Sequence, residues 1–377
     1  MKILFVVQSL KKAGAERMLV NICNELVKDQ KFKVAIFLMK MDNEFQDELD
    51  NRVILAGGEC EIKFSLIRRN IVTNHKYIEF IHKFKPDIIH SHLFHADIFA
   101  HTYYYKDAVY VSHLQNSIVE EYNGFLFKRI FKKPMWTNLY EYSWIYSKYK
   151  KFKTNFIACS AGAYKLHNDR LGIGEVKIIP NASPLPKNLE PRTSVSRIVK
   201  MIWVGRFTDV KRPQLAIQIA KLLRYKDIPF HLKMIGTGLE LDNCKELIHK
   251  EGLAKNVQLC GLMNNMDSIY KNADLLIHTS VYEGLPLVFA EANSYGIPIV
   301  TTNCMPDNDF IVHKKNGLII KTDSPTDFVD GICDIIENSV LYAELSKNAI
   351  EHSKKFGMEN YIQSLLDFYH SMLEKKK

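Results

Sequence analysis

The sequence predicts an α/β protein built from two Rossmann-like domains, and three observations support this prediction. Short runs rich in β-branched residues alternate with stretches of helical periodicity, and parallel strands need such crossover connections. A proline-rich segment near the middle of the chain interrupts the alternation, which then restarts. The length of 377 residues suits two domains of ordinary size.

The first half of the chain begins with a strand. The apolar run after Lys2 is too short for a signal peptide, and polar Gln8 and Ser9 follow it without a cleavage site, so we interpret it as a β-strand. Hydrophobic periodicity then predicts the elements of the first domain: strands at 2–7, 33–39, 87–90, 109–113 and 155–159, and helices at 14–29 and 77–84.

Four prolines within residues 180–191 predict a linker, and the alternation resumes beyond it. The second half is expected to hold strands at 198–204, 230–235, 257–260, 275–279, 299–301 and 318–320, with helices at 213–225, 241–251, 266–272, 287–295 and 359–374. The predicted organisation is an N-terminal domain over 1–180, a linker over 181–197, a C-terminal domain over 198–355, and a C-terminal helix over 356–377 that packs back on the N-terminal domain.

The composition places the chain among cytoplasmic globular proteins. Hydrophobic residues make up 47% and charged residues 25%, which excludes a disordered or fibrous chain. No apolar run reaches the roughly 18 residues of a spanning helix. The seven cysteines are scattered without a C-x-x-C pair, so we expect free thiols in a reducing compartment, and neither a disulfide framework nor a cysteine zinc site.

The charge is distributed unevenly. Residues 1–200 carry 31 Lys and Arg against 20 Asp and Glu, whereas residues 201–377 carry 20 against 22. The segment 125–153 alone holds eight basic residues, one acid and ten aromatic residues. Three interpretations compete: an anionic membrane surface, which attracts both residue types; a solvated basic face over an aromatic core; and single-stranded nucleic acid. We favour the membrane surface, since no nucleic-acid-binding motif accompanies the charge.

Three motifs at strand ends carry chemical meaning. The first is Gly14-Ala15, between the first strand and its helix, where small residues let backbone amides approach a phosphate. An ordinary βα turn explains the same residues equally well. The second is Arg206 with Lys211, just after the first strand of the second half, where two cations suit a diphosphate. Two unrelated surface cations are the alternative.

The third motif joins a strand to the helix that follows it. Glu283 precedes the helix and can reach sugar hydroxyls, while Glu291 lies within the helix and can accept both hydroxyls of a ribose. A capping carboxylate and an exposed helix residue are the alternatives. For Glu291 exposure is disfavoured, because apolar Phe289 and Ala290 precede it.

Together these motifs resemble those of the retaining GT-B glycosyltransferases of family 4. The string from Glu283 to Glu291 is the signature of that family, and Gly205-Arg206 with Lys211 matches its Gly-Arg…Lys motif. The further matches are a Gly-Ala-Glu loop at 14–16 after Ala13 in place of glycine, Pro180-Asn181 before Ala182 in place of glycine, a Gly-x-Gly turn at 236–238, and Asn316-Gly317. They run in order over about residues 3–320, and the resemblance implies a GT-B fold with two domains facing across a cleft.

The resemblance also implies a role for each matching residue. The implied catalytic residues are Glu283, His113, Arg206 and Lys211. Arg206 and Lys211 would hold the donor diphosphate. Glu291 would bind the ribose of the donor, and the main chain around Leu262 would bind the base. Glu283, with the amides of Gly284 and Leu285, would bind the transferred sugar. The Gly14-Ala15 loop would contact the phosphates. His113 would lie near the transferred sugar and the acceptor. The departing phosphate would take the proton of the acceptor, so the reaction would need neither a metal nor a carboxylate nucleophile.

Two other sequence patterns could indicate a metal site. His90, His92, His95 and His101 are close in sequence, and the first two share one strand face, so a metal site is one interpretation. We favour a strand end that lines the ligand cleft. The string from Asp307 to Asp309 spells an Asp-x-Asp motif, which we interpret as a turn.

The sequence therefore predicts a cytoplasmic glycosyltransferase, peripheral on the inner face of the cell membrane. It would move a hexose-type sugar from a nucleotide sugar, with UDP as the expected nucleotide, to a lipid-linked or cell-surface glycan in polysaccharide biosynthesis. A nucleotide-sugar epimerase of the same fold and a non-catalytic sugar-binding subunit are the alternatives. The basic first half disfavours the epimerase, and the complete set of charged motif residues disfavours the non-catalytic subunit. The sugar, the linkage and the acceptor stay open.

Overall fold

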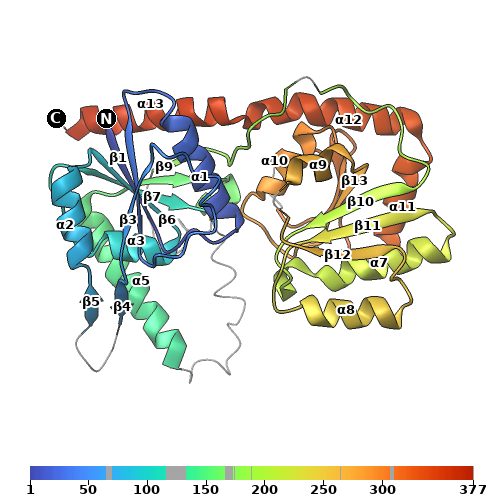
Figure 1. Ribbon diagram of the computed structural model, residues 1–377, viewed down its shortest axis with the longest axis horizontal. Coiled ribbons are helices and arrows are strands. Elements are labelled where there is room, and N and C mark those ends of the chain that lie inside the picture. The colour runs from blue at the N-terminus through green and yellow to red at the C-terminus, as the bar shows by residue number, and fades with distance from the viewer. Residues whose placement is uncertain are drawn as a thin grey trace. The chain divides into compact units, whose positions relative to one another are not determined.

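The computed structural model describes residues 1–64, 70–115, 133–165, 173, 175–187, 189–263, 265–305 and 310–376 (Figure 1). The chain divides into two compact units: Met1–Ala182 together with Met358–Lys377, and Ser183–Gly357. Each unit contains a parallel β-sheet flanked by helices, so the predicted α/β class with two Rossmann-like halves is confirmed.

The first unit is built on a seven-stranded parallel sheet of order β3-β2-β1-β6-β7-β8-β9. Its strands are β1 (Lys2–Val7), β2 (Lys33–Leu38), β3 (Ile54–Gly57), β6 (Ile88–His92), β7 (Val109–Leu114), β8 (Asn155–Ala158) and β9 (Val176–Ile178). The central strands are almost fully buried, as expected where helices cover both faces of a sheet. The chain leaves β1 toward one edge and returns beside it as β6, so the strand order reverses between these two strands.

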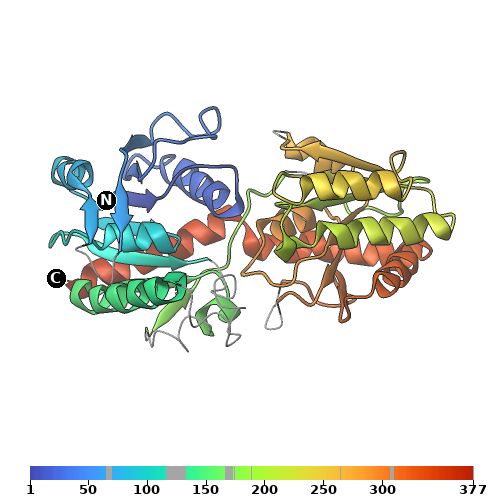
Figure 2. The same cartoon turned by 90° about the horizontal axis from the view of Figure 1, so that it is seen from below.

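The helices of the first unit are α1 (Gly14–Leu26), α2 (His75–Phe84), α3 (Phe94–Ala100), α5 (Lys133–Phe152) and α13 (Met358–Lys376). A small antiparallel pair, β4 (Glu61–Lys63) and β5 (Ile71–Thr73), lies outside the main sheet. The C-terminal helix α13, red in both views, packs against α1 (Figure 1, Figure 2). Its Tyr369 is buried and hydrogen-bonds His90 of β6, which confirms that this helix packs back on the N-terminal half.

The second unit is built on a six-stranded parallel sheet of order β12-β11-β10-β13-β14-β15. Its strands are β10 (Val199–Val204), β11 (Phe230–Ile235), β12 (Val257–Gly261), β13 (Leu275–His278), β14 (Ile299–Thr302) and β15 (Gly317–Ile320). Its helices are α7 (Pro213–Tyr225), α8 (Leu241–Lys250), α9 (Met266–Lys271), α10 (Leu287–Ser294), α11 (Pro325–Ile336) and α12 (Ser339–Ser353), with 3₁₀ turns η2 (Asp209–Lys211) and η3 (Lys354–Phe356). Here the strand order reverses between β10 and β13.

The segment predicted as a linker is anchored to the second unit, most extensively at Arg192. The guanidinium of Arg192 donates to the backbone oxygens of Tyr270 (2.9 Å) and Tyr295 (3.3 Å), and its backbone N–H donates to the hydroxyl of Ser346 (2.9 Å). This part of the chain therefore has a fixed place on the second unit, although its described residues form no helix or strand.

Candidate functional site

The candidate site of the second unit lies at the carboxyl ends of β10 and β13, where its strand order reverses. Ligands of open α/β sheets bind at such a reversal, outside the carboxyl ends of the strands. The loop after β10 carries exposed Arg206 and, in the 3₁₀ turn η2, Lys211. The loop after β13 carries Glu283 and leads into α10. Two motifs that are far apart in the sequence therefore share one edge of the sheet.

Lys211 and Glu283 are in direct contact. The ammonium group of Lys211 forms an ion pair with Oε1 of Glu283, and both side chains are largely buried. The same oxygen accepts hydrogen bonds from the hydroxyl of Ser280 (2.7 Å) and from Nε2 of His278 (3.1 Å). In the part of the chain that the structure describes, all three partners meet Oε1 and none meets Oε2. The second oxygen is thus the atom that a ligand hydroxyl can reach.

The charge of this cluster is set by its buried position and its partners. Burial raises the pKa of the Glu283 carboxyl, but the charge of Lys211 and the hydrogen bonds of His278 outweigh it and lower this pKa to about 2. Burial lowers the pKa of His278, whereas Cys304 and then Glu283 raise it, and the net shift is upward. Glu283 is therefore an ionised hydrogen-bond acceptor at neutral pH.

The two loops are joined by several hydrogen bonds, in which the hydroxyl of Thr279 takes a central part. Thr279, the residue after β13, donates its hydroxyl to the backbone oxygen of Lys211 (2.7 Å) and accepts from Nε1 of Trp203 (2.9 Å). Arg212 donates in return from Nε to the backbone oxygen of Thr279 (2.8 Å). These contacts fix the backbone of the Lys211 loop against the backbone of the Glu283 loop.

The Gly-x-Gly turn after β11 supports the first of these loops. A Cβ atom on Gly236 would lie 2.0 Å from the carbonyl oxygen of Gly205, and one on Gly238 would lie 2.4 Å from that of Phe207. Both glycines also have positive φ, at 133° and 153°. Only glycine fits at these two positions, because the turn passes directly beneath the loop that presents Arg206.

Glu291 lies in α10, behind Glu283. The hydroxyl of Tyr270 donates to Oε2 of Glu291 (2.5 Å), and the ring of Tyr270 stacks on that of Tyr295 at 5.4 Å between centroids. Glu291 is half-buried, so it is not the exposed helix residue that the sequence left as an alternative. Its carboxylate is held at a defined place by an aromatic neighbour.

The remaining predicted donor-site residues of the second unit follow strand ends as well. Gly284 and Leu285 lie between Glu283 and the first residue of α10, and both are partly exposed. Leu262 directly follows β12 and is 50% exposed. Because β12 is separated from β10 by β11, Leu262 lies at the same edge of the sheet but further from the Lys211–Glu283 pair.

The first unit carries the other predicted residues. Gly14 and Ala15 open α1, and no heavy atom lies within 4 Å of a Cβ built on Gly14. The neighbouring cations are already paired, since both Lys12 and Arg17 form ion pairs with Glu48. A ligand at the start of α1 would therefore meet open space and backbone N–H groups, because the nearby cationic side chains are engaged in ion pairs.

His113 lies in a histidine cluster of which the sequence pattern had grouped only His90 and His92. The centroid of its ring lies 5.3 Å from that of His90 and 4.8 Å from that of His92. The rings are close because β6 pairs with β7 in a register that sets His92 opposite His113. His95 and His101 do not join: His101 is bound to the backbone of Asp97 (2.7 Å). Burial lowers the pKa of His113 to about 3, and burial and mutual repulsion lower the pKa values of His90 and His92. All three rings are neutral at pH 7.

The basic and aromatic segment over 125–153 is described only in part, since residues 125–132 lie outside the described residues. Within α5, Tyr149 and Phe152 are buried in the first unit, so these two aromatic residues belong to its core. For them the interpretation of a basic face over an aromatic core holds. Within the described residues, no helix combines the length and the apolar character that crossing a membrane requires. The string from Asp307 to Asp309 also lies outside the described residues.

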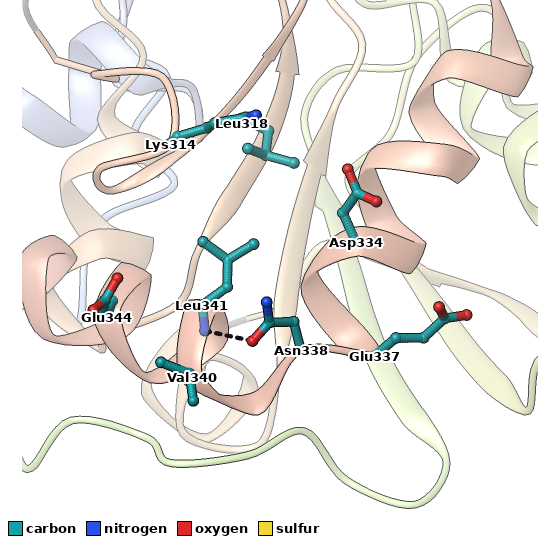
Figure 3. A pocket seen from close by; sticks show the side chains of 8 residues that line it. All are labelled: Lys314, Leu318, Asp334, Glu337, Asn338, Val340, Leu341 and Glu344. Carbon is teal, nitrogen blue, oxygen red and sulfur yellow. Dashed lines mark hydrogen bonds between the residues drawn. The ribbon is translucent and has the colours of Figure 1, made fainter.

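A separate shallow pocket lies on the second unit between β15, α11 and α12 (Figure 3). It is lined by Lys314, Leu318, Asp334, Glu337, Asn338, Val340, Leu341 and Glu344. Asn338 caps α12 there by accepting from the backbone N–H of Leu341 (3.0 Å). The pocket begins at the amino end of β15, whereas the candidate site lies at the carboxyl ends of its sheet, so the two are distinct.

The sequence did not single out His278, Ser280 or Thr279, which hold the site together. The available signal was their position, since all three stand at or just after the carboxyl end of a predicted strand. Such a position is common to many residues that bind nothing, so side-chain contacts were needed to identify them.

Comparisons with known proteins agree with this architecture. The family described as Glycosyltransferase Family 4 matches residues 13–184, and the family described as Glycosyl transferases group 1 matches residues 193–352. The O-antigen biosynthesis glycosyltransferase WbnH of Escherichia coli is 30% identical over 67% of this chain and 66% of its own. An Escherichia coli UDP-Gal:alpha-D-GlcNAc-diphosphoundecaprenol alpha-1,3-galactosyltransferase is 23% identical over 93% of this chain and 92% of its own.

A solved structure gives the same fold. A TarM mutant of S. aureus, in complex with fondaparinux, alpha-GlcNAc-glycerol and UDP, superposes with a TM-score of 0.78 over 98% of this chain and 99% of its own, at 16% identity. At that identity the likeness shows the fold alone. For several other curated relatives, the alignment covers about half of their length or less.

Proposed function

Because the chain belongs to the GT-B glycosyltransferases of the family 4 type, we propose that it transfers a hexose-type sugar from a nucleotide sugar to a glycan acceptor, with retention of the anomeric configuration. The observation that carries the proposal is the Lys211–Glu283 contact at the reversal of the second sheet. It joins a cation suited to a diphosphate with an ionised carboxylate suited to sugar hydroxyls. Both belong to motifs that the family shares.

The proposed donor contacts are assigned residue by residue. In the second unit, Arg206 and Lys211 bind the diphosphate, and Oε2 of Glu283 with the amides of Gly284 and Leu285 binds the sugar. Glu291 receives the ribose and the backbone at Leu262 receives the base. In the first unit, the Gly14-Ala15 loop is the proposed contact for phosphate and His113 the proposed contact for the transferred sugar. Cationic side chains at the diphosphate make a metal at the donor site unnecessary.

The chemistry assigned to the site needs no covalent enzyme intermediate. The bond from the anomeric carbon to the phosphate oxygen breaks, and the bond to the acceptor oxygen forms on the same face. The proton of the acceptor hydroxyl passes to the departing phosphate oxygen. In this step Glu283 accepts hydrogen bonds from sugar hydroxyls through Oε2, while Lys211, His278 and Ser280 hold its Oε1. Lys211 and Arg206 instead stabilise the negative charge that develops on the leaving group.

UDP is the proposed nucleotide, and a lipid-linked or cell-surface glycan is the proposed acceptor. One relative is named for a UDP-galactose donor and a diphosphoundecaprenol acceptor, and another for O-antigen biosynthesis. The TarM complex contains UDP. These names support the class of donor and acceptor, and the sugar and linkage stay open.

The segment over 125–153 is the proposed contact with an anionic membrane surface, which would place a cytoplasmic enzyme beside a lipid-linked acceptor. Its eight basic residues support this, since each contributes about 1 kcal/mol near such a surface. Replacing Lys128, Arg129, Lys132 and Lys133 by Ala should release the protein from anionic vesicles at low salt. Sedimentation with the vesicles measures this, and neutral vesicles are the control. Unchanged binding would contradict the surface assignment.

The donor site can be tested by thermal unfolding with UDP, GDP, ADP or CMP. A ligand at 100 times its dissociation constant adds about 2.7 kcal/mol, which raises the melting temperature by a few degrees. We expect UDP to give the largest shift and Lys211→Ala to abolish it. Lys221→Ala is the matched control, because Lys221 pairs with Glu251 on the same unit. A full UDP shift in Lys211→Ala, or no shift with any nucleotide, would overturn the proposal.

The anomeric outcome and the class of enzyme need a separate measurement. With a UDP-hexose and the matching acceptor, NMR of the product should show the donor's anomeric configuration. An inverted product would refute the front-face assignment. A UDP-hexose that is converted to its epimer without any acceptor would replace the transferase by an epimerase.

A further inference from the structure

The three clustered histidines of the first unit form a group with an unusual set of free ring nitrogens. His90, His92 and His113 are 0%, 1% and 3% exposed. One ring nitrogen from each can be chosen so that all three lie within 4.8 Å of one another. The cluster lies at the carboxyl ends of β6 and β7, next to the reversal of the first sheet, and Phe5 of β1 packs against two of the rings.

The hydrogen bonds of the cluster point outward. Nδ1 of His90 is 2.6 Å from the hydroxyl of Tyr369, and Nδ1 of His92 is 3.1 Å from the side-chain amide of Gln115. By contrast, Nε2 of His90, Nε2 of His92 and both ring nitrogens of His113 are buried without a hydrogen-bond partner among the described residues. Buried polar atoms are nearly always paired, so four such atoms in one place indicate a missing ligand.

This arrangement is the one that a bound transition metal requires. A histidine that binds a metal donates its other ring N–H to a neighbouring acceptor, which fixes the tautomer and the orientation of the ring. Tyr369 serves His90 in this way. Gln115 serves His92 once its amide turns its oxygen toward Nδ1, an orientation that the hydrogen-bond network has to assign.

We propose that His90 Nε2, His92 Nε2 and one ring nitrogen of His113 bind a Zn²⁺ ion, with a water molecule in the fourth position. Imidazole nitrogen is a preferred ligand of Zn²⁺, and an all-nitrogen set disfavours Mg²⁺ and Ca²⁺, which prefer oxygen. Zn–N bonds of about 2.0–2.1 Å in a tetrahedral site separate the ligand nitrogens by about 3.4 Å. The rings therefore draw together when the ion binds.

The ion and the proposed substrate role of His113 are compatible. His113 has two unpartnered ring nitrogens, so one can bind the metal while the other keeps its proton and donates to a sugar hydroxyl. The metal would then fix which nitrogen carries that proton. The site belongs to the first unit alone, and it is separate from the donor diphosphate residues of the second unit.

The test uses tag-free protein that is stripped with a chelator and then equilibrated with Zn²⁺ or Co²⁺. We expect one Zn²⁺ per chain by elemental analysis, and visible Co²⁺ absorption typical of a tetrahedral nitrogen site without sulfur charge-transfer bands. His92→Gln should lose the stoichiometric ion. His231→Gln is the matched control, since His231 is an exposed histidine of the second unit, and it should bind like the wild type. Circular dichroism in chelator shows whether each variant is folded.

A second variant keeps the test decisive if His92→Gln does not fold. Tyr369→Phe removes only the hydrogen bond to His90, and loss of such a supporting bond lowers metal affinity by about 10–100-fold. A merely structural role of Tyr369 would leave zinc affinity unchanged. Less than one ion per chain in the wild type, sulfur bands in the Co²⁺ spectrum, or equal affinity in Tyr369→Phe and wild type would each overturn the proposal.

Discussion

Lys211 and Glu283 are 72 residues apart in the sequence and form an ion pair at one edge of the second sheet. Each stands in a loop that follows a strand, and β10 and β13 are direct neighbours in the sheet. The pair exists because the strand order reverses there, which brings the ends of the first and fourth strands of this unit together. Two motifs that are far apart in the sequence thus become one charged cluster.

Glu283 should give the protein a measurable acid sensitivity. Its pKa is about 2 in the folded protein against 4.5 as the ordinary value, so its contribution to stability is present above pH 4.5 and is lost as the pH falls toward 2. The shift corresponds to about 3 kcal/mol. Urea unfolding at several pH values should show that the free energy of unfolding falls between pH 4.5 and pH 2 in the wild type. The fall should be smaller in Glu283→Gln. Parallel curves for the two proteins would refute the assignment.

Gly236→Ala should destabilise the second unit strongly. The added Cβ would lie 2.0 Å from the carbonyl oxygen of Gly205 in a backbone with φ of 133°, so we expect a loss of about 3 kcal/mol or more. Gly252→Ala is the control: its φ is also positive, but its Cβ meets only the side chain of Arg224 at 3.3 Å, so about 1 kcal/mol is expected. Chemical denaturation compares the two, and similar losses would contradict the steric argument.

Gly14→Ala should separate stability from donor binding. A Cβ on Gly14 meets no atom within 4 Å, and alanine favours helix over glycine, so the melting temperature should stay the same or rise. If the donor phosphates approach this backbone, the methyl group should raise the KM for the nucleotide sugar on the order of tenfold. Gly162→Ala, whose Cβ meets only Ser160 Oγ at 3.9 Å, should leave KM unchanged. An unchanged KM in Gly14→Ala would remove this loop from the donor site.

Tyr149→Phe should destabilise the first unit. The hydroxyl of Tyr149 donates to the carboxylate of Asp97, which also accepts from Ser91 and Ser112 at 2.5 and 2.7 Å. Loss of a buried hydrogen bond to a carboxylate costs about 1.5–3 kcal/mol. Tyr146→Phe, on the same helix but half-buried, should change the unfolding free energy by less than about 0.5 kcal/mol. An equally mild effect at both positions would place Tyr149 outside the core.

Much of the fold was predictable because its signals are local. The central strands are continuous apolar runs such as residues 2–7, and helix α7 begins at Pro213 as its sequence suggests. Among the strands that were missed, β3 and β9 lie at the edges of the main sheet, and their residues Ile54, Leu55 and Ile178 are exposed, so they carry no buried run. The short strands β4 and β5 of the antiparallel pair were missed as well. The described helices that were missed are α3, α5, α11 and α12, and in α5 the aromatic and basic residues conceal the helical period.

The site was predictable in its residues but only partly in its contacts. The motifs indicated Lys211 and Glu283 as neighbours of one ligand, without showing that they bind each other. The histidine cluster depends on the pairing of β6 with β7, which sets His113 opposite His92. Strand register of this kind arises from long-range packing, which the sequence does not show. The sequence pattern therefore grouped His90 and His92 with His95, their neighbour along the chain, rather than with His113.

The hydroxyl of Thr279 has a consequence for how such an enzyme can change its preference for sugars. Since this hydroxyl and the side chain of Arg212 hold the Lys211 loop against the Glu283 loop, a shift of one backbone is carried to the other. Under the proposed function, mutations that reposition Glu283 would therefore also move Lys211 away from the leaving phosphate and lower the rate for every donor. Under the same proposal, a change of sugar preference without that loss is expected from side chains that flank the fixed junction.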